Sequence, residues 1–308
     1  MLRTPALLAG VLFAGVLQAQ DAAGLRARYA GLQDQLAGSA FGRPLHVESA
    51  VSGGEHSGEV YAVIDKPYGV VAAALARPAH WCDILSLQVN VKRCDAPGRG
   101  AGPAVTAFIT RKPRESVESA HRVEFRYQLA AAGEGYVRIA LTSPTGPVGT
   151  EDYQLRLEAA PLDSRRTFLH MSYAYTLGFM ARIAMDAYLG TSGRDKVGFS
   201  VIGRTPEGRP MYVDGVRGVI ERSAMRYYLA IEAFLDSLEA PPPLQLETRL
   251  RGWYAAIARY PQLAEPVGPD EYLEMKRAQA SRVASPRSRR RSRALPAPSA
   301  CASRAHQV

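Results

Sequence analysis

Every second residue is apolar in several stretches of the chain, which is typical of strands with one buried and one exposed face. In the longest stretch, 122–129, Val123, Phe125, Tyr127 and Leu129 alternate with charged and polar residues. Short polar or glycine-containing connections separate the stretches. Strands are expected at 45–51, 60–64, 87–92, 105–110, 122–129, 136–141, 152–158, 167–175 and 197–202, and a short apolar segment follows at 211–213.

Apolar residues recur every three or four positions before and after these strands, which predicts amphipathic helices. Leu25, Leu32 and Leu36 share one such face near the N-terminus, and we expect this helix to pack on the body. The longest stripe lies at 219–238, and the three prolines at 241–243 end its helix as a stiff linker. Further helices are expected at 67–75, 78–83, 177–190 and 246–260, with one or two more turns at 270–280.

Strands that follow one another and then give way to long helices predict an α+β fold, because a parallel sheet needs alternating strands and helices. We expect an antiparallel meander of about half a dozen strands, followed by the long helix at 219–238 and by extra C-terminal helices after residue 243. With 47% hydrophobic and 22% charged residues, the chain has the composition of an ordinary globular protein.

The net charge of +9 is concentrated at the C-terminal end of the chain. Nine of the 38 basic residues lie from Lys276 onward, after the last acidic residue, so the other 29 balance the 29 acidic residues. A neutral body offers no basic face, and we expect no nucleic-acid partner. We predict one domain at 20–275 and a disordered basic tail at 276–308, which is either simply solvated or contacts an anionic membrane surface.

The first 19 residues have the pattern of a secretory signal peptide. Arg3 is followed by an apolar run from Pro5 to Leu17 and by the small residue Ala19, and the run is too short to span a membrane. No cysteine follows at the cleavage region, which argues against a lipid anchor. We therefore expect a periplasmic or secreted protein.

Three cysteines are present, and two of them are candidates for a disulfide. Cys82 and Cys94 would close a short loop in an oxidising compartment, whereas Cys301 is left over in the tail. The alternative is two buried free thiols, because a sequence does not give the distance between them. Neither belongs to a C-x-x-C pair or has a histidine at ligand spacing, so no metal site is expected.

The run Val60–Trp81, which carries Pro67 and Pro78, resembles the opening of the START-like (SRPBCC, helix-grip) superfamily. In that superfamily a strand runs through a proline into a helix, followed by a second helix with a proline and a tryptophan. The resemblance then implies a curved antiparallel sheet wrapped around a long C-terminal helix, which matches the order of elements from Leu87 to Leu238. The runs 81–85 with 90–92, and 194–199 with 215–219, are similar to an exported bacterial branch of the superfamily, which implies no specific activity. The resemblance covers most of 44–238; the helix at 177–190 and the one after 243 depart from the simplest pattern.

The resemblance implies an apolar cavity under the helix at 219–238 that takes a lipid or another hydrophobic small molecule. Aromatic rings with polar tips and an arginine could line it, although the alternative is that these residues are ordinary core and helix surface. His170, two residues from Phe168 and from Ser172 on a predicted strand, is the one histidine considered for the pocket. The alternative is that it is a structural histidine. The candidate ligand-binding residues are Tyr173, Tyr175, Arg226, Tyr227, Tyr228 and His170.

No motif for nucleophilic catalysis, zinc proteolysis, phosphate binding or dinucleotide binding occurs in the chain. We therefore expect no cofactor and name no catalytic residue. The leading hypothesis is an exported protein that binds or carries a hydrophobic ligand. The alternatives are an enzyme that uses the same cavity, with His170 or a tyrosine as acid or base, and a non-catalytic envelope scaffold with a filled core and an exposed apolar patch.

Overall fold

The computed structural model describes residues 21–96 and 104–292, with the backbone alone for 283–292. The predicted signal peptide, most of the predicted loop at 95–103 and the end of the predicted tail lie outside this range. The main sheet has eight strands in the order β1-β2-β8-β7-β6-β5-β4-β3, and every neighbouring pair is antiparallel. Its strands are β1 (Leu45–Ser52), β2 (Glu55–Ile64), β3 (Val91–Asp95), β4 (Ala104–Ile109), β5 (His121–Gly133), β6 (Tyr136–Thr145), β7 (Thr150–Pro161) and β8 (Thr167–Leu177).

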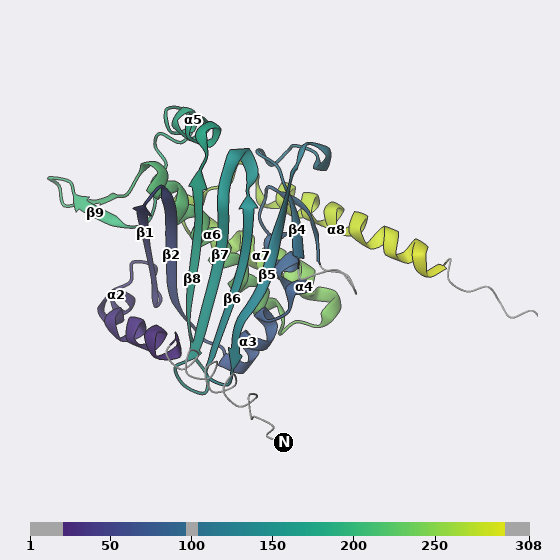
Figure 1. The fold of residues 1–308 in the computed structure, drawn as a ribbon, viewed down its shortest axis with the longest axis horizontal. Coiled ribbons are helices and arrows are strands. Elements are labelled where there is room, and N and C mark those ends of the chain that lie inside the picture. Colours follow the sequence, from purple (N-terminus) through teal and green to yellow (C-terminus); the bar gives the residue numbers. More distant parts are fainter. Residues whose placement is uncertain (1–20, 97–103, 293–308) are drawn as a thin grey trace, which may run out of the picture.

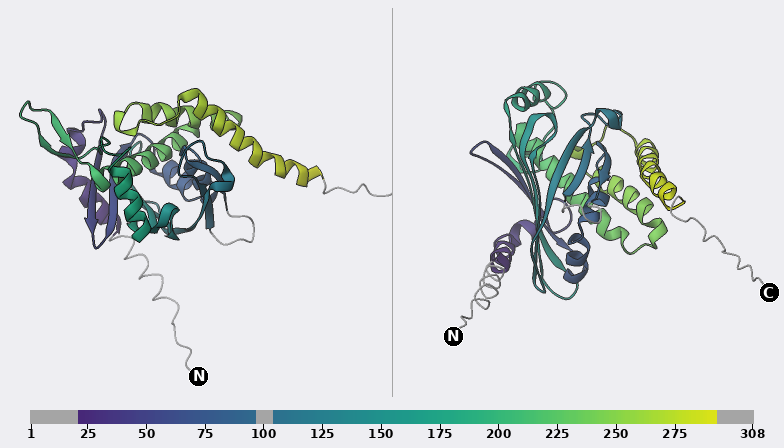
Figure 2. Two further views of the ribbon diagram at one scale, coloured as in Figure 1. Left: turned by 90° about the horizontal axis from the view of Figure 1, so that it is seen from above. Right: turned by 45° about the vertical axis from the view of Figure 1, so that its right-hand side comes forward.

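One face of this sheet packs against α6 (Gly215–Ser237), the long helix predicted from the sequence (Figure 1). The approach is closest at Gly58 of β2, where a Cβ would lie 3.0 Å from the carbonyl oxygen of Ile220 and 3.1 Å from the Cβ of Ala224. A larger residue at position 58 would push the helix away from the sheet. On its other side α6 is covered by α7 (Gln245–Ala258), so the helix lies between two layers (Figure 2).

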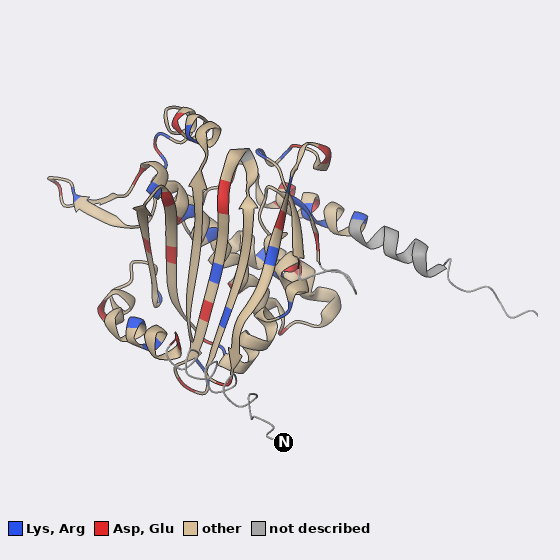
Figure 3. Cartoon of the chain, viewed as in Figure 1, with Lys and Arg blue, Asp and Glu red and all other residues tan. Residues whose placement is uncertain are grey.

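The opposite face of the sheet carries the N-terminal helix at 21–31, which continues after a turn into α2 (Gln33–Ala37). Leu25, Leu32 and Leu36 are buried against Tyr61 and Phe168. The predicted packing of this helix on the body is confirmed. The remainder of this face carries charges of both signs (Figure 3).

Two short helices, α3 (Tyr68–Leu75) and α4 (Pro78–Leu85), connect β2 to β3. Pro67 directly precedes α3, and Pro78 is at the first position of α4, where a missing N–H costs nothing. The predicted disulfide is confirmed: it joins Cys82 of α4 to Cys94 of β3, with the Cα atoms 5.3 Å apart.

The strand predicted at 87–92 is wrong for its first half. Leu87 and Val89 are buried, but the chain there forms turns with i to i−3 hydrogen bonds, and β3 begins only at Val91. Gln88 between them is buried as well and donates to the carbonyl oxygen of Arg226, so the alternation of residue types is not an alternation of faces. The helix α8 (Pro269–Ser292) binds the carbonyl groups of these turns: Tyr272 donates to Leu87, and Lys276 donates to Gln88. A period of two over five residues did not distinguish these turns from a strand.

The predicted start of the tail at residue 276 is also wrong. Lys276 is 3% exposed, and its ammonium group donates to the carbonyl oxygens of Gln88 at 2.6 Å and Val91 at 2.8 Å. The helix α8 continues to Ser292, beyond the point where disorder was expected to begin. The folded part of the chain therefore includes at least the first turns of the predicted tail.

Two elements project from the edge formed by β1 and the end of β8 (Figure 1). They are α5 (Phe179–Leu189) and a small two-stranded sheet of β9 (Val201–Arg204) and β10 (Pro210–Tyr212). Within the described residues, no helix is long and apolar enough to cross a membrane.

Candidate functional site

The candidate residues on β8 lie on opposite faces of the sheet. Tyr173 and Tyr175 share the face that packs on α6, together with Leu169 and Met171, whereas His170 and Ser172 point to the other face. Successive side chains of a strand alternate between the faces, so His170 cannot reach a molecule held between the sheet and α6. The expectation that His170 lines the same pocket as the tyrosines is therefore wrong.

Tyr153 of β7, Tyr173 and Tyr175 of β8 and Tyr227 of α6 form what we call the tyrosine cluster. The ring centroids of Tyr173 and Tyr227 are 5.0 Å apart, and those of Tyr153 and Tyr173 are 5.2 Å apart. The hydroxyls of Tyr153 and Tyr173 are hydrogen-bonded to each other, and the phenol of Tyr227 interacts with that of Tyr153. Three phenol groups thus meet between the sheet and the helix, and three of the six predicted residues come together here.

Burial keeps all four phenols protonated at neutral pH. It raises the pKa of Tyr175 to about 12, and it raises the pKa of Tyr153, Tyr173 and Tyr227 above the usual value of a phenol. A neutral phenol can donate and accept a hydrogen bond, but it is a poor base. The cluster is therefore suited to holding a polar group of a ligand rather than to removing a proton from it.

The residues of α6 that face the sheet are buried, and the tyrosine cluster keeps slightly more accessible surface than they do. Ile220, Ala224 and Ile231 of α6 are 0% exposed, whereas Tyr227 keeps 9% and Tyr153 keeps 7% of its surface accessible. Within the described residues, the Tyr175 hydroxyl makes no hydrogen bond. Side chains without accessible surface line no cavity, so the cavity expected along 219–238 does not extend beneath Ile220, Ala224 or Ile231.

Arg226 and Tyr228, the neighbours of Tyr227 on α6, point elsewhere. Arg226 forms an ion pair with Glu265 at 2.7 Å on the side that faces away from the sheet. The hydroxyl of Tyr228 lies 3.1 Å from Glu232 and accepts from Arg43 at 3.2 Å. Consecutive residues of an α-helix are about 100° apart, so three in a row cannot line one pocket. The structure does not bring these two residues to the tyrosine cluster.

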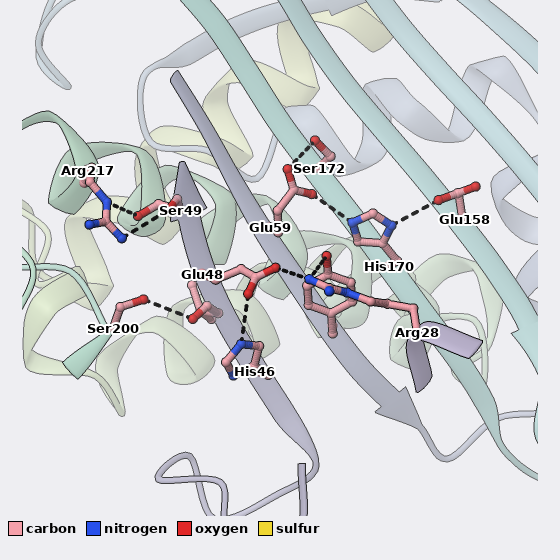
Figure 4. A network of polar contacts seen from close by, with 12 residues as sticks. Arg28, His46, Glu48, Ser49, Glu59, Glu158, His170, Ser172, Ser200 and Arg217 are labelled. Carbon is pink, nitrogen blue, oxygen red and sulfur yellow. Dashed lines mark hydrogen bonds and ion pairs between the residues drawn. The ribbon is translucent and has the colours of Figure 1, made fainter. Parts of the chain in front are cut away.

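His170 lies in a polar network on the outer face of the sheet (Figure 4). Its ring nitrogens are 2.8 Å from Glu59 on β2 and 3.0 Å from Glu158 on β7, and Tyr61 stacks on the ring at 4.4 Å. Burial by itself would lower the pKa of His170, but the hydrogen bonds and charges of the two glutamates outweigh it and raise this pKa to about 9. His170 is thus a cation that joins three strands, which is a structural role.

An open pocket of about 400 Å³ lies at the end of the sheet beside α5. It is lined by the Gly53-Gly54 turn, by Glu151, by residues 176–179 and by Arg182. It therefore lies at the edge where β8 leaves the sheet, two residues beyond Tyr175, and not under the middle of α6. Within the described residues, no group of three or more histidine, cysteine or acidic side chains could hold a metal ion.

Sequence reasoning missed Tyr153, although the signal was present. Tyr153, Leu155 and Leu157 are two residues apart, so the alternation predicts that Tyr153 lies on the packed face of its strand. Nothing in the local sequence indicates that this strand pairs with β8. It also missed Arg222, a buried arginine of α6 that donates to the carbonyl oxygens of Lys196 at 2.9 Å and Val197 at 3.1 Å. In the helical pattern this residue belongs to the polar face.

No family model and no curated protein matches the chain. Solved structures that are similar to it include a norcoclaurine synthase from Thalictrum flavum, with 12% identity, a TM-score of 0.33 and coverage of 45% of this chain and 86% of that one. A Zhui aromatase/cyclase from Streptomyces sp. R1128 has 12% identity, a TM-score of 0.35 and coverage of 66% and 96%. A conserved protein from Geobacillus kaustophilus has 13% identity, a TM-score of 0.30 and coverage of 45% and 85%.

A strand leads through Pro67 into two short helices, and an antiparallel sheet then packs around the long helix α6. The chain therefore has the α+β fold expected from its sequence, an antiparallel sheet packed around a long helix, with α5, α7 and α8 as additions.

Proposed function

We propose that this protein binds a hydrophobic small molecule at the tyrosine cluster, with access from the end of the sheet beside α5. The observation that supports the proposal most is the meeting of three phenol rings between the sheet and α6, two of them joined by a hydrogen bond between their hydroxyls, in an otherwise largely apolar interface that keeps some accessible surface there. Ligand pockets of this kind are mostly apolar with a few placed polar groups, and phenol hydroxyls are such groups.

The direct test is native mass spectrometry of the protein purified from its own cell envelope, followed by extraction and identification of any bound molecule. We expect a hydrophobic molecule in stoichiometric amount. Replacing Tyr227 by Trp places a larger ring in the cluster and should reduce retention, whereas Tyr212→Trp on the projecting β10 should not. An empty wild-type protein would contradict the proposal.

The protein is further proposed to act outside the cytoplasm, in the periplasm or as a secreted protein. The pattern of residues 1–19 and the Cys82–Cys94 disulfide both support this location, because disulfides persist in oxidising compartments. Cell fractionation with N-terminal sequencing of the mature protein should find a chain that begins just after Ala19. A chain that keeps Met1 in the cytoplasm would contradict it.

Contact of the basic tail with an anionic membrane surface remains part of the proposal. Sedimentation with vesicles tests it: full-length protein should bind vesicles with anionic lipid, and a chain that ends at Ala280, which lacks seven of the nine basic residues of the tail, should bind them less. Equal binding by both chains would contradict a contact made by the tail.

The scaffold function is the second candidate, since α5 exposes large apolar side chains. Phe179 is 77%, Met180 66% and Ile183 49% exposed. Such side chains, when they gather, mark interaction sites. If the extracted protein is empty, and if replacing these three residues by polar ones abolishes its association with envelope material, the scaffold function is favoured.

A further inference from the structure

Arg222 is a buried cation without an acidic partner. It is 3% exposed, and its guanidinium group bonds only neutral groups: two backbone carbonyls and the hydroxyl of Tyr188, which lies at 3.4 Å. Among residues 21–96 and 104–292, no carboxylate lies within ion-pair distance of it. Burial of a charge is costly unless an opposite charge accompanies it, so this position favours an anion.

The neighbouring acid does not supply that anion. Glu221 is 0% exposed, but its carboxylate accepts hydrogen bonds from the side chains of Ser49 and Ser200 and from the backbone N–H groups of Phe199 and Ser200, at 2.6 to 2.9 Å. Its hydrogen-bonding capacity is used on the β1 side of α6. The charge of Arg222 thus has no counter-charge from its own helix.

A second unsatisfied group lies at the same end of the sheet. The Nδ1 atom of His56 is buried and has no hydrogen-bond partner. His56 is the cross-strand neighbour of Tyr175, and the two ring centroids are 6.0 Å apart. The Tyr175 hydroxyl likewise has no partner within the described residues. Two groups that can donate a hydrogen bond are therefore free beside the tyrosine cluster.

Arg182 of α5 brings a further positive charge to this end. It lines the open pocket of about 400 Å³ and donates through Nε to the carbonyl oxygen of Leu177 at 3.0 Å. Glu151 also lines this pocket, but it forms no ion pair with Arg182 in the part of the chain that the structure describes. Burial and then the nearby charge of Arg182 lower the pKa of His56, which agrees with an excess of positive potential here.

We infer that the ligand carries one negatively charged head group, a carboxylate or sulfonate, which Arg222, His56 and Arg182 bind at the α5 end while its hydrophobic body lies against the tyrosine cluster. This inference rests on the proposed function and adds the chemical class of the ligand. An oxyanion would pair the charge of Arg222, and it would accept hydrogen bonds from the imidazole of His56 and the hydroxyl of Tyr175.

Two fluorescent probes with the same ring system separate the inference from the proposed function. Anilinonaphthalene sulfonate carries an anionic group, and N-phenylnaphthylamine lacks it. We expect the wild-type protein to bind the sulfonate about 10-fold more tightly, because hydrogen bonds to charged groups contribute about 1.5 kcal/mol or more. The neutral probe should still bind.

Single substitutions test which residues produce the preference for the sulfonate probe over the neutral probe. Arg222→Gln and His56→Gln should each reduce the ratio of the two affinities about 3-fold, because each removes one of the groups that share the preference of about 10-fold. Arg182→Gln, at the rim, should have a smaller effect in the same direction. Arg204→Gln on β9 removes one positive charge away from the site and is the matched control. Because Arg222 also holds two backbone carbonyls, His56→Gln tests the same site without that loss, and circular-dichroism melting verifies the fold of each variant.

The outcomes distinguish the two proposals. Equal affinity for both probes, or a preference that survives both Arg222→Gln and His56→Gln, overturns the anionic head group and leaves hydrophobic binding intact. If neither probe binds, the proposed function fails, and the inference fails with it.

Discussion

The polar network around His170, on the outer face of the sheet, allows a prediction of how the free energy of unfolding depends on pH. His170 lies between Glu59 and Glu158, which hold its pKa at about 9, whereas a histidine in an unfolded chain has a pKa of about 6.5. The folded protein therefore binds this proton more tightly than the unfolded chain does. The resulting stabilisation is fully present below about pH 6.5 and is lost as the pH rises through about 9.

The size of the effect follows from that interval. The pKa of His170 differs between the unfolded and the folded state, about 6.5 against about 9, and at roughly 1.4 kcal/mol for each pKa unit this difference corresponds to about 3 kcal/mol. The His170 side chain is only 19% exposed, so solvent screens its charge little. Replacing His170 by Gln keeps a hydrogen-bond donor but removes the charge. The loss of unfolding free energy should therefore be about 3 kcal/mol larger at pH 6 than at pH 10.

Urea unfolding followed by circular dichroism at both pH values measures this difference. All variants should carry Cys301→Ser, because a free thiolate at pH 10 would exchange with the disulfide. His121→Gln, at an exposed histidine at the start of β5, is the matched control and should change stability little at either pH. If His170→Gln costs the same at pH 6 and pH 10, the histidine is not a cation held by the two glutamates, and the reasoning is refuted.

Three further predictions concern stability and the candidate site. Replacing Cys82 and Cys94 by Ser should lower the free energy of unfolding by about 2–3 kcal/mol, measured in urea, because the unfolded chain loses a constraint; no change would contradict this. Ending the chain after Ser292 should leave the melting temperature unchanged, whereas ending it after Glu274, which removes the buried Lys276, should lower it clearly; equal melting temperatures would show that α8 does not stabilise the body. Tyr153→Phe should weaken binding of the extracted ligand about 5-fold, measured by competition with N-phenylnaphthylamine, because one hydroxyl is lost; unchanged binding would place the ligand elsewhere.

Local pattern was sufficient for most of the secondary structure and for the sheet. Runs with a period of two identified seven of the eight strands of the main sheet, because their inner residues face the helices and their outer residues face water or the N-terminal helix; β3 was met only at its first two residues. The same parity already separated His170 from Tyr173 and Tyr175, and helix geometry separated Arg226 and Tyr228 from Tyr227. The six candidate ligand-binding residues are close in sequence, but the period of two residues in a strand and of 3.6 residues in a helix places them on different faces.

The composition of the site depended on contacts between distant parts of the chain. Tyr153 joins the cluster because β7 pairs with β8, and Arg222 is buried because the chain at 196–200 folds back over α6. Lys276 is buried because α8 returns to the turns before β3. Which side of each strand or helix is apolar follows from the spacing of residues along the chain and could be predicted. Which apolar sides meet, and which charges are buried between them, depends on contacts between residues that no local spacing relates.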